Sequence, residues 1–163
     1  MRLYTSNFAC AGNNKYAISI SRYSPRWYTG NICKFLYPPS DMIKDKESTK
    51  EEWTKHYEER VLNNVNRKLL IQGFKDGSIL LCYEKRTDFC HRFIVAKWLE
   101  KSNKIDRIVE LRNREEVSLA QSYNDYLEYP YCKEKEKIRI YIQERTTEEL
   151  RQYLQIELYC GVV

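Results

Sequence analysis

One short apolar run constrains the fold of this chain more than any other feature. Residues 79–83 read Ile-Leu-Leu-Cys-Tyr, and the turn residues Asp76, Gly77 and Ser78 precede them. The run is too short for a helix, and a strand that is apolar at successive positions must be covered on both faces. Strands of this kind lie in the middle of parallel sheets. We therefore predict a central parallel strand here.

The rest of the chain alternates strands with helices. A helix is expected to begin at Ser48 or Thr49, because a glutamate follows each hydroxyl three residues later and completes a capping box. Trp53 and Tyr57 start an apolar face at four-residue steps in this helix, which breaks near residues 63–64. Further elements are expected as strands at 2–8, 16–21 and 107–111, as a helix at 90–101, and as a loop at 23–40. This order predicts an α/β fold with a small, mostly parallel sheet flanked by helices and joined by right-handed crossovers.

The length of 163 residues suits one domain with a sizeable core. The character of the sequence changes after residue 111, so we expect a core of residues 1–111 and an α+β addition of residues 112–163 packed on it. In the addition a helix is expected at 115–127, a strand at 138–142 and a last helix from residue 146.

Charge and cysteine content narrow the class of protein. The net charge of +5 is compatible with a polyanionic partner, but acidic residues are mixed among the basic ones, so the signal for nucleic acid is weak. We find no membrane-length apolar run and no signal-peptide pattern, and we expect a soluble, cytoplasmic protein. The six cysteines form no CxxC pair, so we expect mostly free thiols.

Two neighbouring motifs are the strongest candidates for chemistry. Cys82 and Glu84 share one face at the carboxyl end of the predicted central strand, where α/β sheets bind ligands. Cys90, His91 and Arg92 begin the following helix, which Thr87 or Asp88 is expected to cap. Helix amides and a neighbouring cation stabilise anions and lower a thiol's pKa. We therefore predict Cys90 as the nucleophile, Glu84 and His91 as acid/base groups, and Arg92 as an anion ligand.

These residues also have purely structural interpretations. Cys82 suits core packing, His91 could cap or pair within the fold, and Glu84 could form an ion pair with Arg92 or Arg22. A third interpretation is a zinc site, with Cys82, Cys90 and His91 as ligands and Cys10 or Cys33 as a fourth. The spacing matches no standard zinc pattern and adjacent Cys-His pairs rarely chelate together, so we predict no metal and no cofactor.

A loop rich in arginine and aromatic residues follows the second predicted strand. Its guanidinium groups and rings could grip phosphate or stack on a base, or could instead cover the core. The candidate ligand-binding residues in it are Arg22, Ser24, Arg26, Trp27 and Tyr28.

Taken together, these sequence motifs resemble those of the family called domain of unknown function 488. The resemblance rests on the arginine loop, on Leu-Leu-Cys-Tyr-Glu at 80–84 and on Phe-Cys-His-Arg at 89–92, and it spans residues 1–111. It implies a small bacterial, archaeal or phage protein without an assigned reaction. It also implies that the family's motif positions fall on Arg22, Cys82, Glu84, Cys90, His91 and Arg92.

Two functional hypotheses follow. The first is a small enzyme that acts on a phosphorylated or nucleotide-like ligand at the Cys/Glu/His/Arg site. The second is a non-catalytic module that binds nucleic acid or a protein partner through the arginine loop and the tyrosine-rich addition. No membrane partner is expected.

Overall fold

Strand β4 (Ser78–Cys82) lies at the centre of the sheet in the computed structural model, which describes residues 1–85, 87–106 and 108–128. All five residues of β4 are buried. It pairs in parallel with β1 (Leu3–Asn7) on one side and with β2 (Ala17–Ser19) on the other. The short strands β3 (Asn31–Ile32) and β5 (Val109–Glu110) complete a parallel sheet in the order β3-β2-β4-β1-β5. The predictions of an α/β fold and of a central parallel strand are confirmed.

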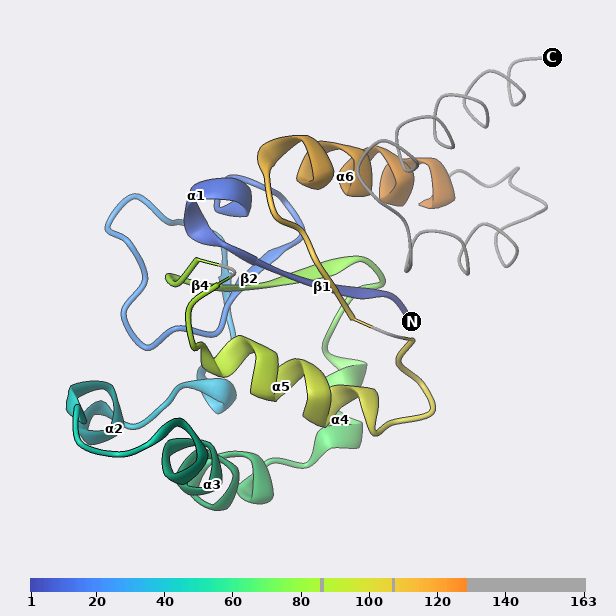
Figure 1. The fold of residues 1–163 in the computed structure, drawn as a ribbon. Helices are drawn as coiled ribbons and strands as arrows, with labels where there is room; N and C mark the ends of the chain where they lie inside the picture. The colour runs from blue at the N-terminus through green and yellow to red at the C-terminus, as the bar shows by residue number, and fades with distance from the viewer. Residues whose placement is uncertain (86, 107, 129–163) are drawn as a thin grey trace, which may run out of the picture.

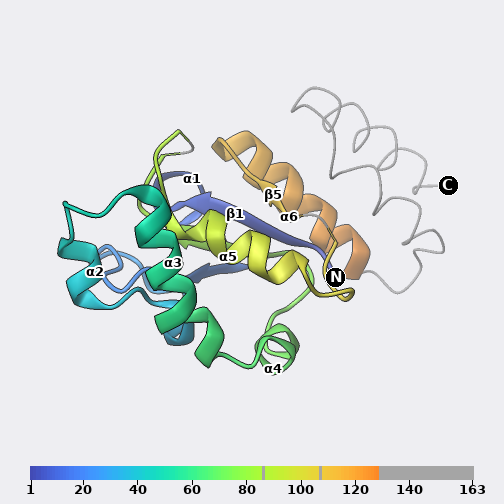
Figure 2. The same cartoon turned by 60° about the horizontal axis from the view of Figure 1, so that its bottom comes forward.

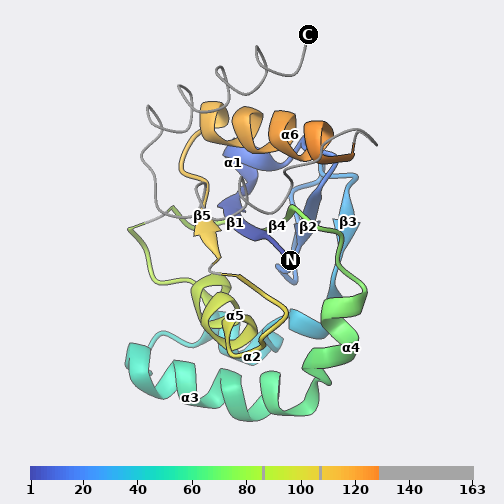
Figure 3. The same ribbon diagram turned by 90° about the vertical axis from the view of Figure 1, so that its right-hand side faces the viewer.

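Helices cover both faces of this sheet (Figures 1 and 3). One face carries α1 (Phe8–Ala11) and α6 (Arg114–Glu128). The other face carries α2 (Ser40–Lys44), α3 (Lys50–Arg60), α4 (Arg67–Gln72) and α5 (His91–Glu100). The two layers account for the apolar character of β4 at every position, since neither side of the strand meets water.

The core divides into two clusters separated by the sheet. Leu81 faces the α1/α6 layer, where it joins Phe8 and Val117. Leu80 faces the other layer, where it joins Val95 among the buried residues of the second cluster. Because side chains alternate along a strand, consecutive residues of β4 serve opposite cores.

The helix predicted near residue 49 begins as a capping box requires. The Thr49 hydroxyl accepts the backbone N–H of Glu52, whose side chain in turn accepts the N–H of Thr49. The expected break is confirmed, because α3 ends at Arg60 and a 3₁₀ turn (Leu62–Asn64) separates it from α4. Gly77 then turns the chain into β4 with φ of 82°, a left-handed conformation that glycine adopts without strain.

The segment 23–40 is more ordered than the predicted loop. It contains β3 and a 3₁₀ turn (Lys34–Leu36), and its last residue begins α2. Two residues are too few to produce a readable strand pattern, so β3 is recognisable only from its pairing with β2.

The helix expected at 115–127 is confirmed as α6, whose Val117 and Ala120 join the cluster on the α1 face. The strand expected at 138–142, the last helix, Cys132 and Cys160 lie outside the described residues. The division at residue 111 therefore stays a proposal. Among the described helices none is long and apolar enough to cross a membrane.

Candidate functional site

Three potential ligand residues meet where β4 ends and α5 begins. Cys82 is the last residue of β4, Cys90 is the N-cap residue of α5, and His91 is the first residue of that helix. All three are buried, and their sulfur and ring-nitrogen atoms lie within 4.8 Å of one another. We call these residues the thiol–imidazole cluster. The predicted juxtaposition of strand end and helix start therefore exists.

The orientation of His91 is fixed by a backbone carbonyl. His91 Nε2 lies 2.9 Å from the carbonyl oxygen of Ile20, which can only accept, so Nε2 carries the proton. In the neutral ring Nδ1 then holds a lone pair, and it lies 3.6 Å from Cys82 Sγ and 4.0 Å from Cys90 Sγ. The Ile20 amide is itself bound to the carbonyl of Leu81, which ties the acceptor to β4.

Aromatic side chains hold the same ring from the side of α3. The Tyr57 ring meets the His91 imidazole edge to face at 5.5 Å, and its hydroxyl donates to the Leu36 carbonyl. Trp53 stacks on Tyr57 and meets Phe89 edge to face. Figure 2 shows α3 lying beside the start of α5, as these contacts require.

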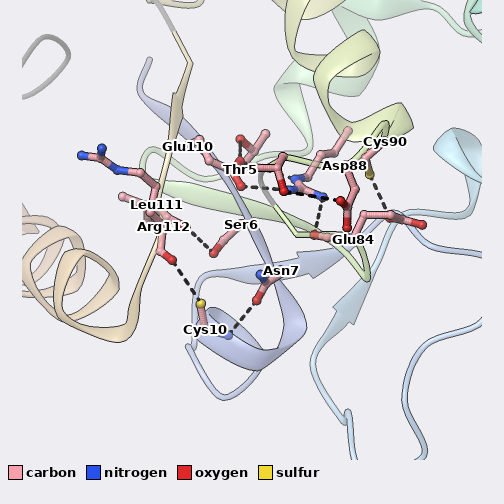
Figure 4. Close-up of polar contacts among 12 residues, drawn as sticks. Thr5, Ser6, Asn7, Cys10, Glu84, Asp88, Cys90, Glu110, Leu111 and Arg112 are labelled. Atoms are coloured by element: carbon pink, nitrogen blue, oxygen red, sulfur yellow. Dashed lines mark hydrogen bonds and ion pairs between the residues drawn. The ribbon is translucent and has the colours of Figure 1, made fainter. Parts of the chain in front are cut away.

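Glu84 lies beside Cys90, as Figure 4 shows, and accepts a hydrogen bond from its thiol at 3.0 Å. Burial raises the pKa of the Glu84 carboxyl, but hydrogen bonds from Cys82 and Cys90 outweigh burial and hold the pKa below its usual range. Glu84 is therefore an ionised acceptor that faces a neutral thiol.

The predicted low pKa of Cys90 is wrong. Burial raises the pKa of the Cys90 thiol far above its ordinary value, Cys82 adds to the rise, and His91 offsets only part of it. The side chain is 3% exposed, so loss of hydration outweighs the helix dipole. The predicted caps are also wrong, because Cys90 occupies the N-cap position, where no side chain caps α5.

Arg92 lies under the site and has no exposed surface. Its guanidinium donates to the Glu84 carbonyl at 2.8 Å and forms an ion pair with Glu110 at 3.0 Å. Glu110 also accepts the hydroxyl of Thr5. Arg92 therefore fixes the backbone of Glu84 to β5 and is no longer available as the anion ligand that we predicted.

A cavity of about 440 Å³ opens over the thiol–imidazole cluster, and we call it the cluster cavity. It lies at the carboxyl ends of β2 and β4, the edge at which parallel sheets bind ligands. Besides the cluster and Glu84, its lining includes four aromatic residues, two lysines and three serine or threonine residues: Tyr23, Trp53, Tyr83, Phe89, Lys46, Lys50, Ser21, Ser48 and Thr49.

Sequence reasoning missed most of this lining. The segment 45–53 approaches the cluster only in the folded chain. Its hydroxyls were assigned to the helix cap alone, and its lysines gave the only other sequence signal. Trp53 and Tyr57 were assigned to an apolar helix face without a known neighbour. His56, on α3, is exposed and lies outside the cavity lining.

The arginine loop does not line the cluster cavity except through Tyr23. Arg22 is exposed and donates to the Pro38 carbonyl at 2.7 Å, and Ser24 bonds to Ser19. Trp27 is exposed and Tyr28 half-buried, and both pack against Phe8. Arg26 is exposed. The predicted joining of this loop with Glu84 and Cys90 into one site is therefore not what the fold produces.

A larger groove of about 1100 Å³ lies at the opposite edge of the sheet, near the start of β4. Ile32, Phe35 and Leu69 contribute exposed apolar surface to it, and no His, Asp or Glu is among its described lining residues. Of these two hollows in the described part of the chain, the cluster cavity is the one that combines acid/base groups with a parallel-sheet carboxyl edge, and we place the candidate site there.

Comparison with known proteins supports the resemblance seen in the sequence. The family model of the domain of unknown function DUF488 matches residues 32–99, which contain Cys82, Glu84, Cys90, His91 and Arg92. The match is shorter than the predicted 1–111 and leaves out the arginine loop. No curated protein and no solved structure matches the chain. The matched segment holds these motif residues and covers less than half of the chain, so residues 32–99 are similar to the DUF488 family.

Proposed function

We propose that this protein is a small enzyme that acts on a phosphorylated, nucleotide-like ligand in the cluster cavity. The observation that carries the proposal is the cavity itself, which brings acid/base and sulfur groups under a rim of rings and lysines. Its volume of about 440 Å³ falls within the range of roughly 300–1,000 Å³ that is common for small-molecule sites.

The lining favours an anion attached to a flat ring. Lys46 and Lys50 are exposed, and neither has an ion-pair partner among the described residues. Asp45 also lines the cavity, but its carboxylate accepts the backbone amides of Glu47 and Ser48. The lysines are therefore the groups that can hold a phosphate, while Trp53 and Phe89 offer faces and edges to a base.

Glu84 is the acid/base group in this proposal. It is half-buried, faces the cavity and is ionised, so it can accept a proton from a bound ligand. Its backbone is anchored by Arg92, which limits its movement. Cys90 is a weaker candidate nucleophile than its sequence position indicates, because a buried neutral thiol must first lose its proton.

Binding is tested by titration calorimetry with inorganic phosphate, a nucleoside and its monophosphate. We expect the monophosphate to bind most tightly, and the double variant Lys46→Ala/Lys50→Ala to lose at least about tenfold in affinity, as befits charge-assisted contacts. Lys55→Ala is the matched control, since Lys55 is 74% exposed on α3 and outside the cavity lining. Equal binding by the double variant and the control would refute the assignment.

Turnover is tested separately with a panel of phosphorylated compounds followed by mass spectrometry. Glu84→Gln should keep ligand affinity within a few fold and abolish turnover, because the amide fills the same space but accepts no proton at neutral pH. A Glu84→Gln variant with wild-type turnover would remove Glu84 from the mechanism.

One observation favours the second candidate, a nucleic-acid binding module. Tyr23 and Trp27 are 58% and 54% exposed, with Arg26 exposed between them. Exposed rings beside a guanidinium can stack on unpaired bases. This candidate requires retention on single-stranded nucleic acid that weakens steeply with salt and that Arg26→Ala reduces.

A further inference from the structure

We propose that the thiol–imidazole cluster is a zinc site, with Cys82, Cys90 and His91 as protein ligands and a fourth position open to the cluster cavity beside Glu84. Zinc binding does not depend on the function proposed above. Only the use of the metal in a reaction on the cavity's ligand rests on that proposed function.

The three donor atoms already lie near the corners of one coordination shell. With zinc–sulfur bonds of about 2.3 Å and zinc–nitrogen bonds of about 2.0 Å, tetrahedral geometry places sulfur and nitrogen about 3.5 Å apart. Nδ1 of His91 lies 3.6 Å from Cys82 Sγ and 4.0 Å from Cys90 Sγ, and no pair in the group exceeds 4.8 Å. A metal ion therefore needs only small side-chain movements.

The imidazole is oriented as a ligand. Its Nε2–H donates to the Ile20 carbonyl, which leaves the Nδ1 lone pair directed toward both sulfurs. Backbone carbonyls commonly fix metal-binding histidines in this way, through the ring nitrogen that does not bind the metal. The Tyr57 ring restricts rotation from the side.

The backbone at the start of α5 explains how adjacent residues can share one ion. Cys90 is extended, with φ of −149° and ψ of 137°, whereas His91 is the first helical residue. The chain changes direction between them, so the two side chains turn toward the same point instead of opposite sides. Adjacent residues of a uniform strand or helix point in different directions and rarely bind one metal ion. At an N-cap the backbone changes direction between the two residues, so both side chains can reach the same ion.

Charge balance selects the class of ion. Binding releases one proton from each thiol, and the two thiolates then neutralise a divalent cation while the imidazole stays neutral. The ion, the two thiolates and the ring then carry no net charge, which avoids the large desolvation penalty of an unpaired charge among the three buried ligands. The half-buried Glu84 keeps its own negative charge beside Cys90 at the cavity. A monovalent cation would leave one negative charge buried, and hard ions such as Mg²⁺ prefer oxygen ligands.

The open fourth position gives the metal a chemical use. Three protein ligands with a free position characterise catalytic zinc, and two cysteines with one histidine is one of its ligand sets. Glu84 lines the cavity beside Cys90 and accepts the Cys90 thiol proton in the metal-free protein. Zinc would displace that proton, and the freed carboxylate would then be the group beside the open position that can accept a proton from water.

The test is a zinc titration of the reduced, chelator-treated full chain against a chromophoric chelator, without any cavity ligand. We expect one zinc per chain for the wild type and for Cys33→Ser, whose thiol is also buried but lies outside the cluster. Cys82→Ser and Cys90→Ser should each lose at least about 100-fold in affinity, since even outer-shell changes cost about 10–100-fold. Equal affinity in all four proteins would overturn the proposal.

Cobalt substitution keeps the test decisive if a serine variant fails to fold. Wild-type protein loaded with Co²⁺ should show strong tetrahedral absorption and thiolate-to-cobalt charge-transfer bands of an intensity expected for two sulfur ligands. A wild type that binds neither zinc nor cobalt would reject the metal site and leave the nucleotide titration unaffected. Zinc binding without any nucleotide binding would reject the proposed ligand and keep the metal site.

Discussion

Arg92 carries a permanent charge at a position with no exposed surface, and its partners explain how the fold tolerates it. The guanidinium contacts Glu110 on β5 and the carbonyl of Glu84, and it stacks on the ring of Phe93 at 4.4 Å. The charge of Arg92 is compensated only when α5, β5 and the segment around Glu84 have packed together. The group therefore links the start of α5 to the sheet edge and to the candidate site.

Replacing Arg92 by methionine should destabilise the fold strongly. The methionine fills similar space but leaves Glu110 as an unpaired, largely buried carboxylate, and breaking a buried ion pair typically costs about 3–5 kcal/mol. Urea denaturation followed by circular dichroism measures the change. Arg60→Met provides the control, because its pair with Asp41 is solvent-exposed and should contribute little. Similar unfolding midpoints for both variants would contradict the structural role of Arg92.

Asp76 anchors the start of β1 to the turn before β4. It accepts the backbone amide and the guanidinium of Arg2 at 2.6 Å each. Burial raises the pKa of Asp76, but the hydrogen bonds and charge of Arg2 outweigh it, so the folded pKa lies below the usual value. The unfolded chain then binds the proton more readily, and this contribution to stability is present above about pH 4 and is lost as pH falls through the folded pKa.

An Asp76→Asn variant should be less stable than wild type at pH 6, and the difference should shrink as the pH falls below about 4. The measurement is the free energy of unfolding at several pH values between 3 and 6. For Glu47→Gln, at an exposed position, the free energy of unfolding should change with pH as it does in the wild type. If the stability difference for Asp76→Asn stays constant with pH, the ionised Asp76 is not the source of the effect.

At the scale of single residues, the sequence predicts that the end of β4 and the start of α5 meet, but not which distant residues join them or how the group is solvated. Cys82, Cys90 and His91 were locatable because each adjoins a strand end or a helix start. The raised pKa of Cys90 and the burial of Arg92 were not, because they depend on α3 and β5, which join the site only through tertiary packing. The sequence around Cys90 and Arg92 does not show which residues, distant along the chain, will pack over them and exclude solvent.

At the scale of elements, α3 shows where sequence reasoning succeeds and where it stays ambiguous. Ser48 and Thr49 both fit a capping box, and the structure selects Thr49. Only geometry separates them, because each has its own glutamate three residues later. Strand β3 shows the opposite case, since two residues are recognisable as a strand only through their partner.

Because Thr49 and not Ser48 caps α3, alanine substitutions at these two positions should change the stability of the protein by different amounts. Thr49→Ala removes the hydroxyl that accepts the Glu52 amide and should cost about 1 kcal/mol. Ser48→Ala should change stability little, because the Ser48 hydroxyl is not the cap. Thermal and urea denaturation of both variants give the comparison. A larger loss for Ser48→Ala than for Thr49→Ala would mean that the cap lies one residue earlier.

At the scale of the whole molecule, the sheet separates two hydrophobic cores. The sequence did not predict which helices cover which face of the sheet. A helix at 115–127 was predicted from its pattern, yet that pattern does not say which face it covers. In the structure Val117 of α6 meets Phe8, Leu81 and Leu111, all from the predicted core. We therefore propose that α6 and residues 1–111 unfold as one cooperative unit.

The substitution Val117→Asp tests this cooperativity. Val117 is 6% exposed within the cluster, and a carboxylate there must either lose its hydration without a partner or push α6 off the sheet. We expect a loss of about 3 kcal/mol or more and a lower midpoint for the whole protein in urea, read both by far-ultraviolet circular dichroism and by tryptophan fluorescence. Ser118→Asp, exposed on the same helix, should leave the midpoint nearly unchanged. If α6 were an independent appendage, Val117→Asp would reduce the helical signal alone. The fluorescence midpoint, which reports on Trp27 beside Phe8 and on Trp53 and Trp98 beside the other core, would not move.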